Sequence, residues 1–345
     1  MVARPRRVLL TGATGLLGAH LLEELLAQTD AHVVCLVRAG SADLGRARVR
    51  EVRARYHMEE SPDARWSVVA ADLAEALPEL GFGDVDAVVH AGAGVNWLAR
   101  YDAVRGANVL GTEALLRLAA SGAGTAFHHV STISTAPLAG DERSFLSFDE
   151  AAAGSGYALS KWVAECEVRS AQTEGAPVFV HRPGLVTGHH RRGIGNPSDF
   201  VHRYLRACRQ YGVYLDRPEH LDMTPVDYVA RGIVAAVLDP THAPAVTHLC
   251  NVHTSPSFAA AGKAVAGSDA RGLDYEAFRQ AAVLPPESPL RALASYFPPG
   301  HFGLGSGPWP DAKTRAWLGA RGVACPVVDE EVLARYGAAL GESLP

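Results

Sequence analysis

Tyr157 and Lys161, four positions apart, are the clearest candidates for chemistry in this sequence. They lie in the segment YALSK, at the start of a stretch, Tyr157–Gln172, whose apolar residues recur at helical spacing. Because residues four apart share one face of a helix, both side chains can reach one bound molecule. A free tyrosine, with a pKa of about 10, is a poor acid or base at neutral pH, and a nearby ammonium group lowers that pKa. The pair therefore predicts acid–base chemistry by the tyrosine.

A hydroxyl group that could act beside the tyrosine comes from the segment HHVSTIST. This segment ends a predicted strand, Ala126–Thr132, and offers four hydroxyls, at Ser131, Thr132, Ser134 and Thr135. A hydroxyl at this place can bind a substrate carbonyl while the tyrosine donates a proton. We choose Thr132 for this role, and the other three hydroxyls are near enough in the sequence to compete for it.

A glycine-rich turn, TGATGLLG at 11–18, is typical of a phosphate-binding loop. Gly12, Gly15 and Gly18 follow a short apolar strand and precede a predicted helix, Ala19–Gln28. Glycines at these positions let the turn close tightly, let the backbone approach a pyrophosphate and let the helix pack on the strand. The amino end of the helix adds N–H donors and the positive end of a dipole. These features predict a dinucleotide site.

The end of the second predicted strand, His32–Arg38, favours NADPH over NADH. Enzymes that bind NAD usually carry an acidic residue there for the ribose hydroxyl, whereas this chain has Arg38 and no acid from 32 to 40. A guanidinium group can fork onto a 2′-phosphate. Arg48 could reach the same phosphate, or it could belong to the solvated face of an arginine-rich helix. Asp72, after the third strand, could meet the adenine or simply cap a loop.

These residues need a framework of parallel strands to position them. Short runs rich in Val and Ala alternate with stretches of helical spacing, which is the pattern of a doubly wound α/β sheet buried on both faces. The expected strands are Val8–Leu10, His32–Arg38, Trp66–Leu73, Asp86–Gly92, Ala126–Thr132 and Val178–Gly188, and the expected helices include Asn108–Ser121, Tyr157–Gln172, Ser198–Tyr211 and Glu330–Leu340. We predict a Rossmann domain over 1–188 and a smaller, partly helical substrate region over 189–345, with some later segments returning to the first domain.

The overall composition excludes several classes of protein. The chain has 345 residues and a net charge of −5, a poor match for general nucleic-acid binding. It has no run of about 18 apolar residues, so we expect no membrane span. Its five cysteines lie far apart, which predicts reduced thiols and a cytoplasmic location. The pairs His128–His129 and His189–His190 would point to opposite faces of a strand, so we predict no metal site.

The motifs together resemble those of the extended short-chain dehydrogenases/reductases. The shared segments are TGATGLLG, the ADL at Asp72, HAGAGV at 90–95, NVLGT at 108–112, VSTIST and YALSK. Within that superfamily, the segments VNWLARYDAVRGANVLGT, VSTISTAP, GYALSKWVAE, RPGLVTGHHRRGIGNPSDF, MTPVDYVA and CPVVDEEVLARY resemble the terminal thioester reductase domains of nonribosomal peptide and polyketide synthetases, kin of the reductase domain of carboxylic acid reductases. The chain starts almost at its first strand, as a free-standing enzyme or an excised domain would.

The resemblance implies reductive release of an acyl or peptidyl thioester from the phosphopantetheine arm of a carrier protein. Thr132 and Tyr157 would stabilise the oxyanion, Tyr157 would protonate it, and Lys161 would hold the nicotinamide ribose. The product would be an aldehyde, and a second round would give the alcohol. The implied contacts with NADPH are Gly12, Thr14, Gly15, Leu16, Leu17, Gly18, Arg38, Arg48, Asp72, Leu73, Ala91, Gly92, Ala93, Asn108, Ser131, Tyr157, Lys161, Pro183 and Gly184.

Three other functions share part of this pattern. A sugar-nucleotide epimerase or dehydratase has the same glycines and YxxxK, but it would retain its cofactor without net consumption, and Arg38 disfavours the members that retain NAD. A fatty acyl-CoA reductase differs mainly in what carries the thioester. A non-catalytic NADP-sensing protein would commonly lack the tyrosine and lysine that this chain keeps.

Two groups of residues have both a functional and a structural interpretation. Five arginines, at positions 191, 192, 203, 206 and 209, could form a docking face for an acidic carrier or an ordinary solvated helix face. Trp97 and Tyr101 could contact an acyl chain, although packing is the commoner fate of such aromatic side chains.

Overall fold

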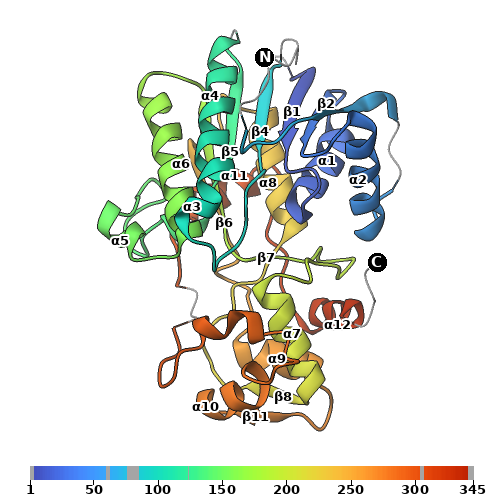
Figure 1. The fold of residues 1–345 in the computed structure, drawn as a ribbon, viewed down its shortest axis with the longest axis vertical. Helices are drawn as coiled ribbons and strands as arrows, with labels where there is room; N and C mark the ends of the chain where they lie inside the picture. Colours follow the sequence, from blue (N-terminus) through green and yellow to red (C-terminus); the bar gives the residue numbers. More distant parts are fainter. Residues whose placement is uncertain (1–3, 60–62, 76–84, 123, 304–306, 341–345) are drawn as a thin grey trace. The chain divides into compact units, whose positions relative to one another are not determined.

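The computed structural model describes residues 4–59, 63–75, 85–122, 124–303 and 307–340. The chain divides into two compact units (Figure 1). The first unit comprises Met1–Pro183, Tyr228–Leu249 and Trp309–Ala324, and the second comprises Gly184–Asp227, Cys250–Pro308 and Cys325–Pro345.

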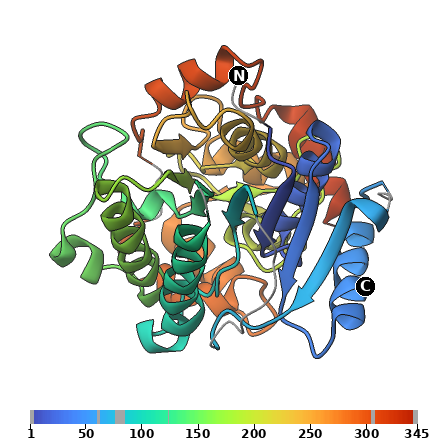
Figure 2. The ribbon, with the colours of Figure 1, turned by 90° about the horizontal axis from the view of Figure 1, so that it is seen from above.

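The first unit is built on a sheet of seven parallel strands with helices on both faces (Figure 2). The strands are β1 (Arg7–Thr11), β2 (His32–Val37), β3 (Trp66–Ala70), β4 (Ala87–His90), β5 (Ala126–Val130), β6 (Val178–Pro183) and β10 (Val246–Leu249). Their order in the sheet is β10-β6-β5-β4-β1-β2-β3, and the direction in which the chain adds strands reverses between β1 and β4. Ligands of doubly wound sheets bind at the point of this reversal, beyond the carboxyl ends of the strands. The predicted α/β fold is confirmed.

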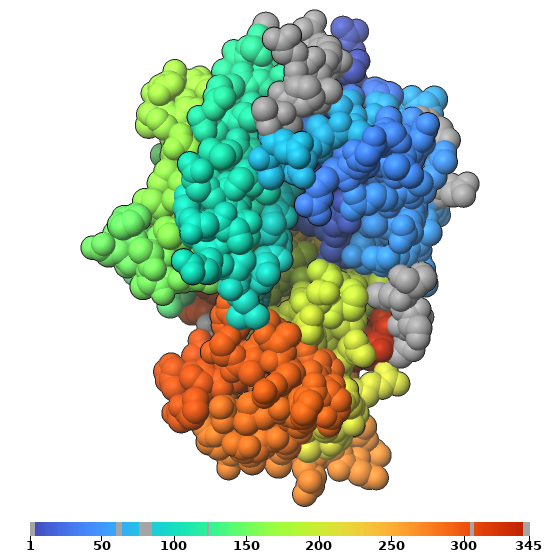
Figure 3. Space-filling view, viewed as in Figure 1, coloured from blue at the N-terminus to red at the C-terminus, as the bar shows by residue number. Residues whose placement is uncertain are grey.

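Buried apolar side chains join this sheet to its helices. Leu9, Val88, Phe127 and Val180 from the strands pack with Leu115 in a central core. The helices of the unit are α1 (Leu16–Gln28), α2 (Ala42–Arg55), α3 (Tyr101–Arg105), α4 (Gly111–Ser121), α5 (Phe148–Ala152), α6 (Gly156–Thr173), α8 (Val226–Leu238), which belongs to this unit from Tyr228 onward, and α11 (Ala312–Gly319). Helices α2, in blue, and α4, in green-cyan, form part of the surface of this unit that faces the viewer in Figure 3.

The second unit is smaller and partly helical. Its helices are α7 (Phe200–Tyr211), α9 (Phe258–Ala266), α10 (Tyr275–Phe278) and α12 (Glu330–Ala339), and its strands form two short pairs, β7 (Val186–Thr187) with β9 (Thr224–Pro225) and β8 (Val213–Leu215) with β11 (Arg271–Leu273). Tyr204 of α7 packs its ring against Phe258 and Phe278 in the aromatic core of the unit. Helix α7 begins at the capping carboxylate of Asp199 and ends at Gly212, whose φ of 59° suits glycine.

The structure differs from the sequence prediction mainly after β6. The expected strand Val178–Gly188 is two strands, because β6 stops at Pro183, which has no N–H to continue a ladder. The boundary between the units therefore lies after Pro183 rather than after residue 188, and two later segments, 228–249 and 309–324, belong to the first unit. The seventh strand, β10, has only four residues, too few for a periodic signal. Among the described residues, no helix is long and apolar enough to cross a bilayer.

Candidate active site

The three glycines of the first loop have different tasks. Gly12 has a φ of +81°, and a Cβ there would lie 2.7 Å from the carbonyl carbon of Ala91. A Cβ on Gly18 would lie 1.9 Å from the carbonyl oxygen of Gly12, so these two positions serve the close packing of the chain on itself. Gly15 is exposed, and its nearest neighbour would be 3.4 Å from a Cβ. It precedes α1 without a side-chain cap, so the N–H groups of the first helical turn are available for an anion.

We expect Gly18→Ala and Gly15→Ala to separate these tasks. Overpacking of this kind costs about 1–3 kcal/mol, so Gly18→Ala should lower the thermal unfolding midpoint. Gly15→Ala should leave the midpoint unchanged and weaken binding of the nicotinamide cofactor, because the added methyl group stands where the pyrophosphate would approach. Thermal melts and fluorescence titrations of the cofactor measure both effects. Unchanged affinity in Gly15→Ala would contradict a phosphate site at this helix.

An open pocket of about 520 Å³ lies beside the ends of β2 and β3 and is lined by Arg38 and Asp72. Arg38 is exposed, and the guanidinium of Arg48 donates to its carbonyl oxygen, so both arginines are near this pocket. Asp72 also caps its own loop, since its Oδ1 accepts from the N–H of Ala74 at 2.9 Å. On the same helix, Arg46 stacks over Trp66 instead, which makes Arg48 the better candidate for a phosphate contact.

The segment after β4 is joined by hydrogen bonds to both β1 and α6. The N–H of Gly92 donates to Thr11 Oγ1 at 2.9 Å, and that of Gly94 donates to Asn108 Oδ1 at 2.6 Å. Asn108 is buried in a π-helical turn, Gly106–Leu110, and donates through Nδ2 to Ser160 Oγ at 2.9 Å. The stretch from Ala91 to Gly94 is thereby held at a fixed place beside the helix that carries the tyrosine and lysine.

Tyr157 and Lys161 lie at the start of α6, which begins at the capping hydroxyl of Ser155. Tyr157 is half-buried, and Lys161 is almost fully buried. The Nζ of Lys161 donates to the carbonyl oxygen of Val130 at 2.7 Å. Burial raises the pKa of Tyr157 to about 12 and lowers the pKa of Lys161 to about 8. In the chain without bound ligands, the prediction that Lys161 lowers the pKa of Tyr157 is therefore wrong. Burial of the phenol sets the direction of that shift, and the ammonium group of Lys161 is bound to β5.

The four hydroxyls after β5 divide into two kinds. Ser131 and Thr135 are buried and donate to Oε2 of Glu165 at 2.7 and 2.9 Å. Thr132 is half-buried and caps the short turn Ile133–Thr135, with its Oγ1 2.9 Å from the hydroxyl of Ser134. The role of Thr132 as substrate ligand stays a prediction, while the hydroxyls of Ser131 and Thr135 are already bonded to Glu165. Because the hydroxyl of Ser131 is bonded to Glu165 in the core, only the backbone of Ser131 could contact a cofactor.

A buried ion pair behind the site was not predicted from the sequence. Glu165 and Arg182 are both fully buried, and their side chains are joined at 2.5 Å. Arg182 also donates to the carbonyl oxygen of Ser144 at 2.8 Å, and Arg169 bonds to Glu165 at 3.0 Å. The signals that could have found it were an acid one turn after Lys161 and an arginine inside the apolar strand VFVHRP.

The remaining predicted residues lie at the edges of these elements. Leu73 packs so closely that a Cβ on Gly92 would lie 2.8 Å from its Cδ1. Pro183 ends β6 in the first unit, and Gly184 begins the second unit, where a Cβ would lie 2.1 Å from Oδ2 of Asp222. The other members of the predicted cofactor set, Thr14, Leu16, Leu17 and Ala93, belong to the turn before α1, its first helical residues and the stretch after β4.

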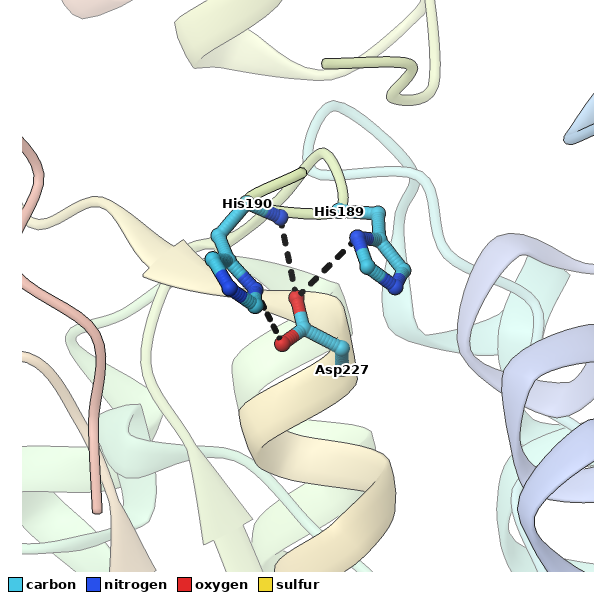
Figure 4. Close-up of side chains that lie close together, drawn as sticks. All are labelled: His189, His190 and Asp227. Atoms are coloured by element: carbon cyan, nitrogen blue, oxygen red, sulfur yellow. Dashed lines mark hydrogen bonds and ion pairs between the residues drawn. The ribbon is translucent and has the colours of Figure 1, made fainter. Parts of the chain in front are cut away.

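In the second unit, His189, His190 and Asp227 come together (Figure 4). The two histidines follow β7 in a turn, and their rings are stacked with centroids 5.4 Å apart, so the expectation of opposite faces is wrong. His190 Nδ1 lies 2.6 Å from Asp227 Oδ2, and His189 Nδ1 accepts from the N–H of Arg191 at 3.1 Å. Although burial raises the pKa of Asp227, the two histidines outweigh it and hold that pKa below its ordinary value. These atoms are already hydrogen-bonded, and the absence of a metal site stays a prediction.

Comparison with known proteins agrees with the resemblance seen in the motifs. The family described as male sterility protein, with an NAD-binding domain, matches residues 10–233. A linear gramicidin synthase protein of Brevibacillus parabrevis is 33% identical over 95% of this chain and 7% of its own length. Isonitrile lipopeptide synthase of Streptomyces coeruleorubidus is 40% identical over 67% of this chain and 16% of its own length. The chain thus spans only a small part of these curated relatives.

Solved structures extend the similarity to nearly the whole chain. The terminal R domain from the myxalamid PKS-NRPS biosynthetic pathway is 36% identical, with a TM-score of 0.86 over 99% of this chain and 91% of that domain. The chain therefore belongs to the male sterility protein family, as an oxidoreductase of the extended short-chain dehydrogenase/reductase type, and the resemblance to synthetase reductase domains is confirmed.

Proposed function

We propose that this protein uses NADPH to reduce an acyl or peptidyl thioester, carried on the phosphopantetheine arm of a carrier protein, to an aldehyde and, with a second hydride, to the alcohol. The observation that carries the proposal is that Lys161, one turn after Tyr157 on α6, donates to Val130 at the carboxyl end of β5, two residues before Thr132, in a chain similar to synthetase R domains. The five cysteines form no disulfide among the described residues, which suits the cytoplasmic location that forms part of the proposal.

The residues present suit a nicotinamide dinucleotide. Gly15 and the start of α1 would hold the pyrophosphate, Arg38 and Arg48 the 2′-phosphate, and Lys161 the nicotinamide ribose. When bound, the cofactor supplies a hydride to the thioester carbonyl carbon.

Side chains of the protein would stabilise the substrate's carbonyl oxygen and protonate it. Thr132 and Tyr157 would donate hydrogen bonds to the carbonyl oxygen as it becomes negative. Because burial raises the pKa of Tyr157 to about 12, the phenol keeps its proton at neutral pH and can give it to that oxygen. The resulting thiohemiacetal then collapses, its C–S bond breaks, and the aldehyde leaves a free thiol on the carrier.

NADPH oxidation with an acyl-S-pantetheine substrate, with the product trapped as an oxime, tests this function. We expect NADPH to be consumed in step with aldehyde or alcohol formation. Parallel reactions with acyl-CoA and with carrier-loaded thioester would show which thioester is preferred. If NADPH binds but none of these thioesters causes its consumption, the proposal fails, and a sugar-nucleotide enzyme or an NADP sensor becomes the better account.

Replacement of Arg38 should change the choice of cofactor. Hydrogen bonds to charged groups are worth about 1.5–3 kcal/mol, so we expect Arg38→Ser to reduce the ratio of NADPH to NADH efficiency by about 10- to 100-fold. Arg50→Ala, an exposed change on the neighbouring helix α2, is the control. Values of kcat/KM for both cofactors give the ratio. An unchanged ratio in Arg38→Ser would show that the 2′-phosphate is bound elsewhere.

The docking face for the carrier is better tested at one arginine than at two. Arg203 donates to the carbonyl oxygens of Ser198 and Pro289 at 2.9 and 2.8 Å, so its charge reversal would also disturb the second unit. Arg206, on the same helix α7, is exposed.

We therefore expect Arg206→Glu to raise the KM for carrier-bound substrate by about two- to fivefold, the size of one exposed ion pair. The KM for acyl-S-pantetheine should not change. Lys263→Glu, an exposed charge reversal on α9 of the same unit, serves as the control. Equal losses with both substrates would contradict docking at α7.

A further inference from the structure

The ammonium group of Lys161 rests against two acceptors of strand β5. Its Nζ donates to Val130 O at 2.7 Å and lies 3.3 Å from Nε2 of His129. His129 has no exposed surface, and Lys161 is 2% exposed. Since an ammonium group has three N–H donors, this arrangement leaves one for a molecule bound at the site.

The His129 ring can accept this hydrogen bond only in its neutral form, with its proton on Nδ1. Burial holds the pKa of His129 well below its ordinary value, and the nearby Lys161, His90 and His181 lower it further, so the ring is neutral.

That tautomer leaves an unsatisfied donor in the core. The Nδ1 of His129 is buried and has no hydrogen-bond partner among the described residues. An apolar side chain of similar volume would avoid this defect, because a buried donor without a partner is unfavourable. The ring also packs beside His90 and Phe127, with centroids 5.5 and 6.5 Å away, but an apolar ring could make these contacts as well. The contact with Lys161 is the one that needs an acceptor nitrogen.

We propose that His129 is a positioning residue. Its ring fixes the position of the Lys161 ammonium group and favours the charged form of that group, so that the third N–H remains available to bind the cofactor. The inference rests on the role given to Lys161 in the proposed function. The lysine's other titratable neighbours are Glu165, one turn along α6, His90 on β4 and Tyr157 at the start of α6.

The balance of charges makes this contact important near neutral pH. Burial lowers the pKa of Lys161 to about 8, although the carboxylate of Glu165 raises it. Loss of an acceptor for an N–H of the ammonium destabilises the charged form, so the pKa of the lysine falls further. The pH above which the site loses its cation then moves down toward the physiological range.

The experiment compares His129→Leu, His129→Gln and His128→Leu with the wild type. The amide oxygen of glutamine can accept from Lys161, whereas leucine cannot. His128 is the matched control, because it too is fully buried on β5 and has an orphaned ring nitrogen, but its Nδ1 faces His181 at 3.2 Å.

We expect His129→Leu to fold with an unchanged or higher melting midpoint, and the alkaline limbs of NADPH binding and of kcat/KM to move down by about one pH unit. His129→Gln should restore the wild-type profile, and His128→Leu should keep it. An unmoved profile in His129→Leu, an equal shift in His128→Leu or no rescue by glutamine would overturn the proposal. Failure of His129→Leu to fold would also overturn it, since the ring would then be needed for packing.

The binding profile separates this inference from the proposed function. NADPH binding across pH can be measured by fluorescence without any turnover. If the wild type reduces no thioester but the binding profiles shift as expected, the proposed function is rejected and the role of His129 in positioning Lys161 is retained. If thioesters are reduced and the profiles do not shift, only the inference fails.

Discussion

Tyr157→Phe is expected to lower turnover of an acyl-S-pantetheine substrate by about two to four orders of magnitude, the usual contribution of a positioned general acid. The phenylalanine ring fills the same space on α6 but has no proton to give to the developing oxyanion. Melting midpoint and cofactor affinity should stay close to the wild type, because the substitution keeps the aromatic ring and removes only one oxygen atom.

Single-turnover kinetics with trapped aldehyde measure the loss most directly. Tyr56→Phe, which removes the hydroxyl of another tyrosine of the first unit, is the control and should keep full activity. If Tyr157→Phe retains more than a tenth of the turnover, the proton comes from another group.

The pKa of Tyr157 is raised to about 12 and that of Lys161 is lowered to about 8. We therefore expect the alkaline limb of the wild-type pH–rate profile to report the deprotonation of Lys161.

Arg182→Met is expected to lower the free energy of unfolding by about 3–5 kcal/mol, because it leaves the buried carboxylate of Glu165 without its closest partner. Adding Glu165→Gln should recover part of the loss, since the amide keeps a group that Ser131 and Thr135 can bond. Urea unfolding measures these values. The control is Arg117→Met, whose exposed pair with Glu113 should matter by less than about 1 kcal/mol.

The same pair predicts a dependence of stability on pH. Burial raises the pKa of Glu165, but Arg182 outweighs it and holds that pKa below its ordinary value. A carboxyl group with a lowered folded-state pKa stabilises the fold above its ordinary pKa of about 4, and this contribution is lost as pH falls through the folded-state value. The stability difference between wild type and Arg182→Met should therefore narrow in acid. A constant difference from neutral to acid pH would contradict the ion pair.

Much of the fold and of the candidate site of this protein can be predicted from short-range sequence patterns. The glycine loop at 11–18, the alternation of apolar strands with helical stretches, and the spacing of Tyr157 and Lys161 are local features, and each carries its own physical reason. They are sufficient for the fold class, the cofactor loop, the pair on α6 and the family. The neighbouring hydroxyls Ser131 and Thr132, by contrast, look equivalent in the sequence.

The tertiary structure decided which groups face which neighbours. The Ser131 hydroxyl donates to the buried carboxylate of Glu165 on α6, whereas the Thr132 hydroxyl caps the turn Ile133–Thr135. Lys161 is bound to β5, and its pairing there depends on residues about thirty positions away in the chain. Such contacts depend on strand order and packing between distant segments, which no local period encodes. The sequence by itself thus determined the fold class and the candidates for the reacting side chains, and only the folded chain determined the partners and the pKa values of these candidates, because burial and long-range neighbours set both.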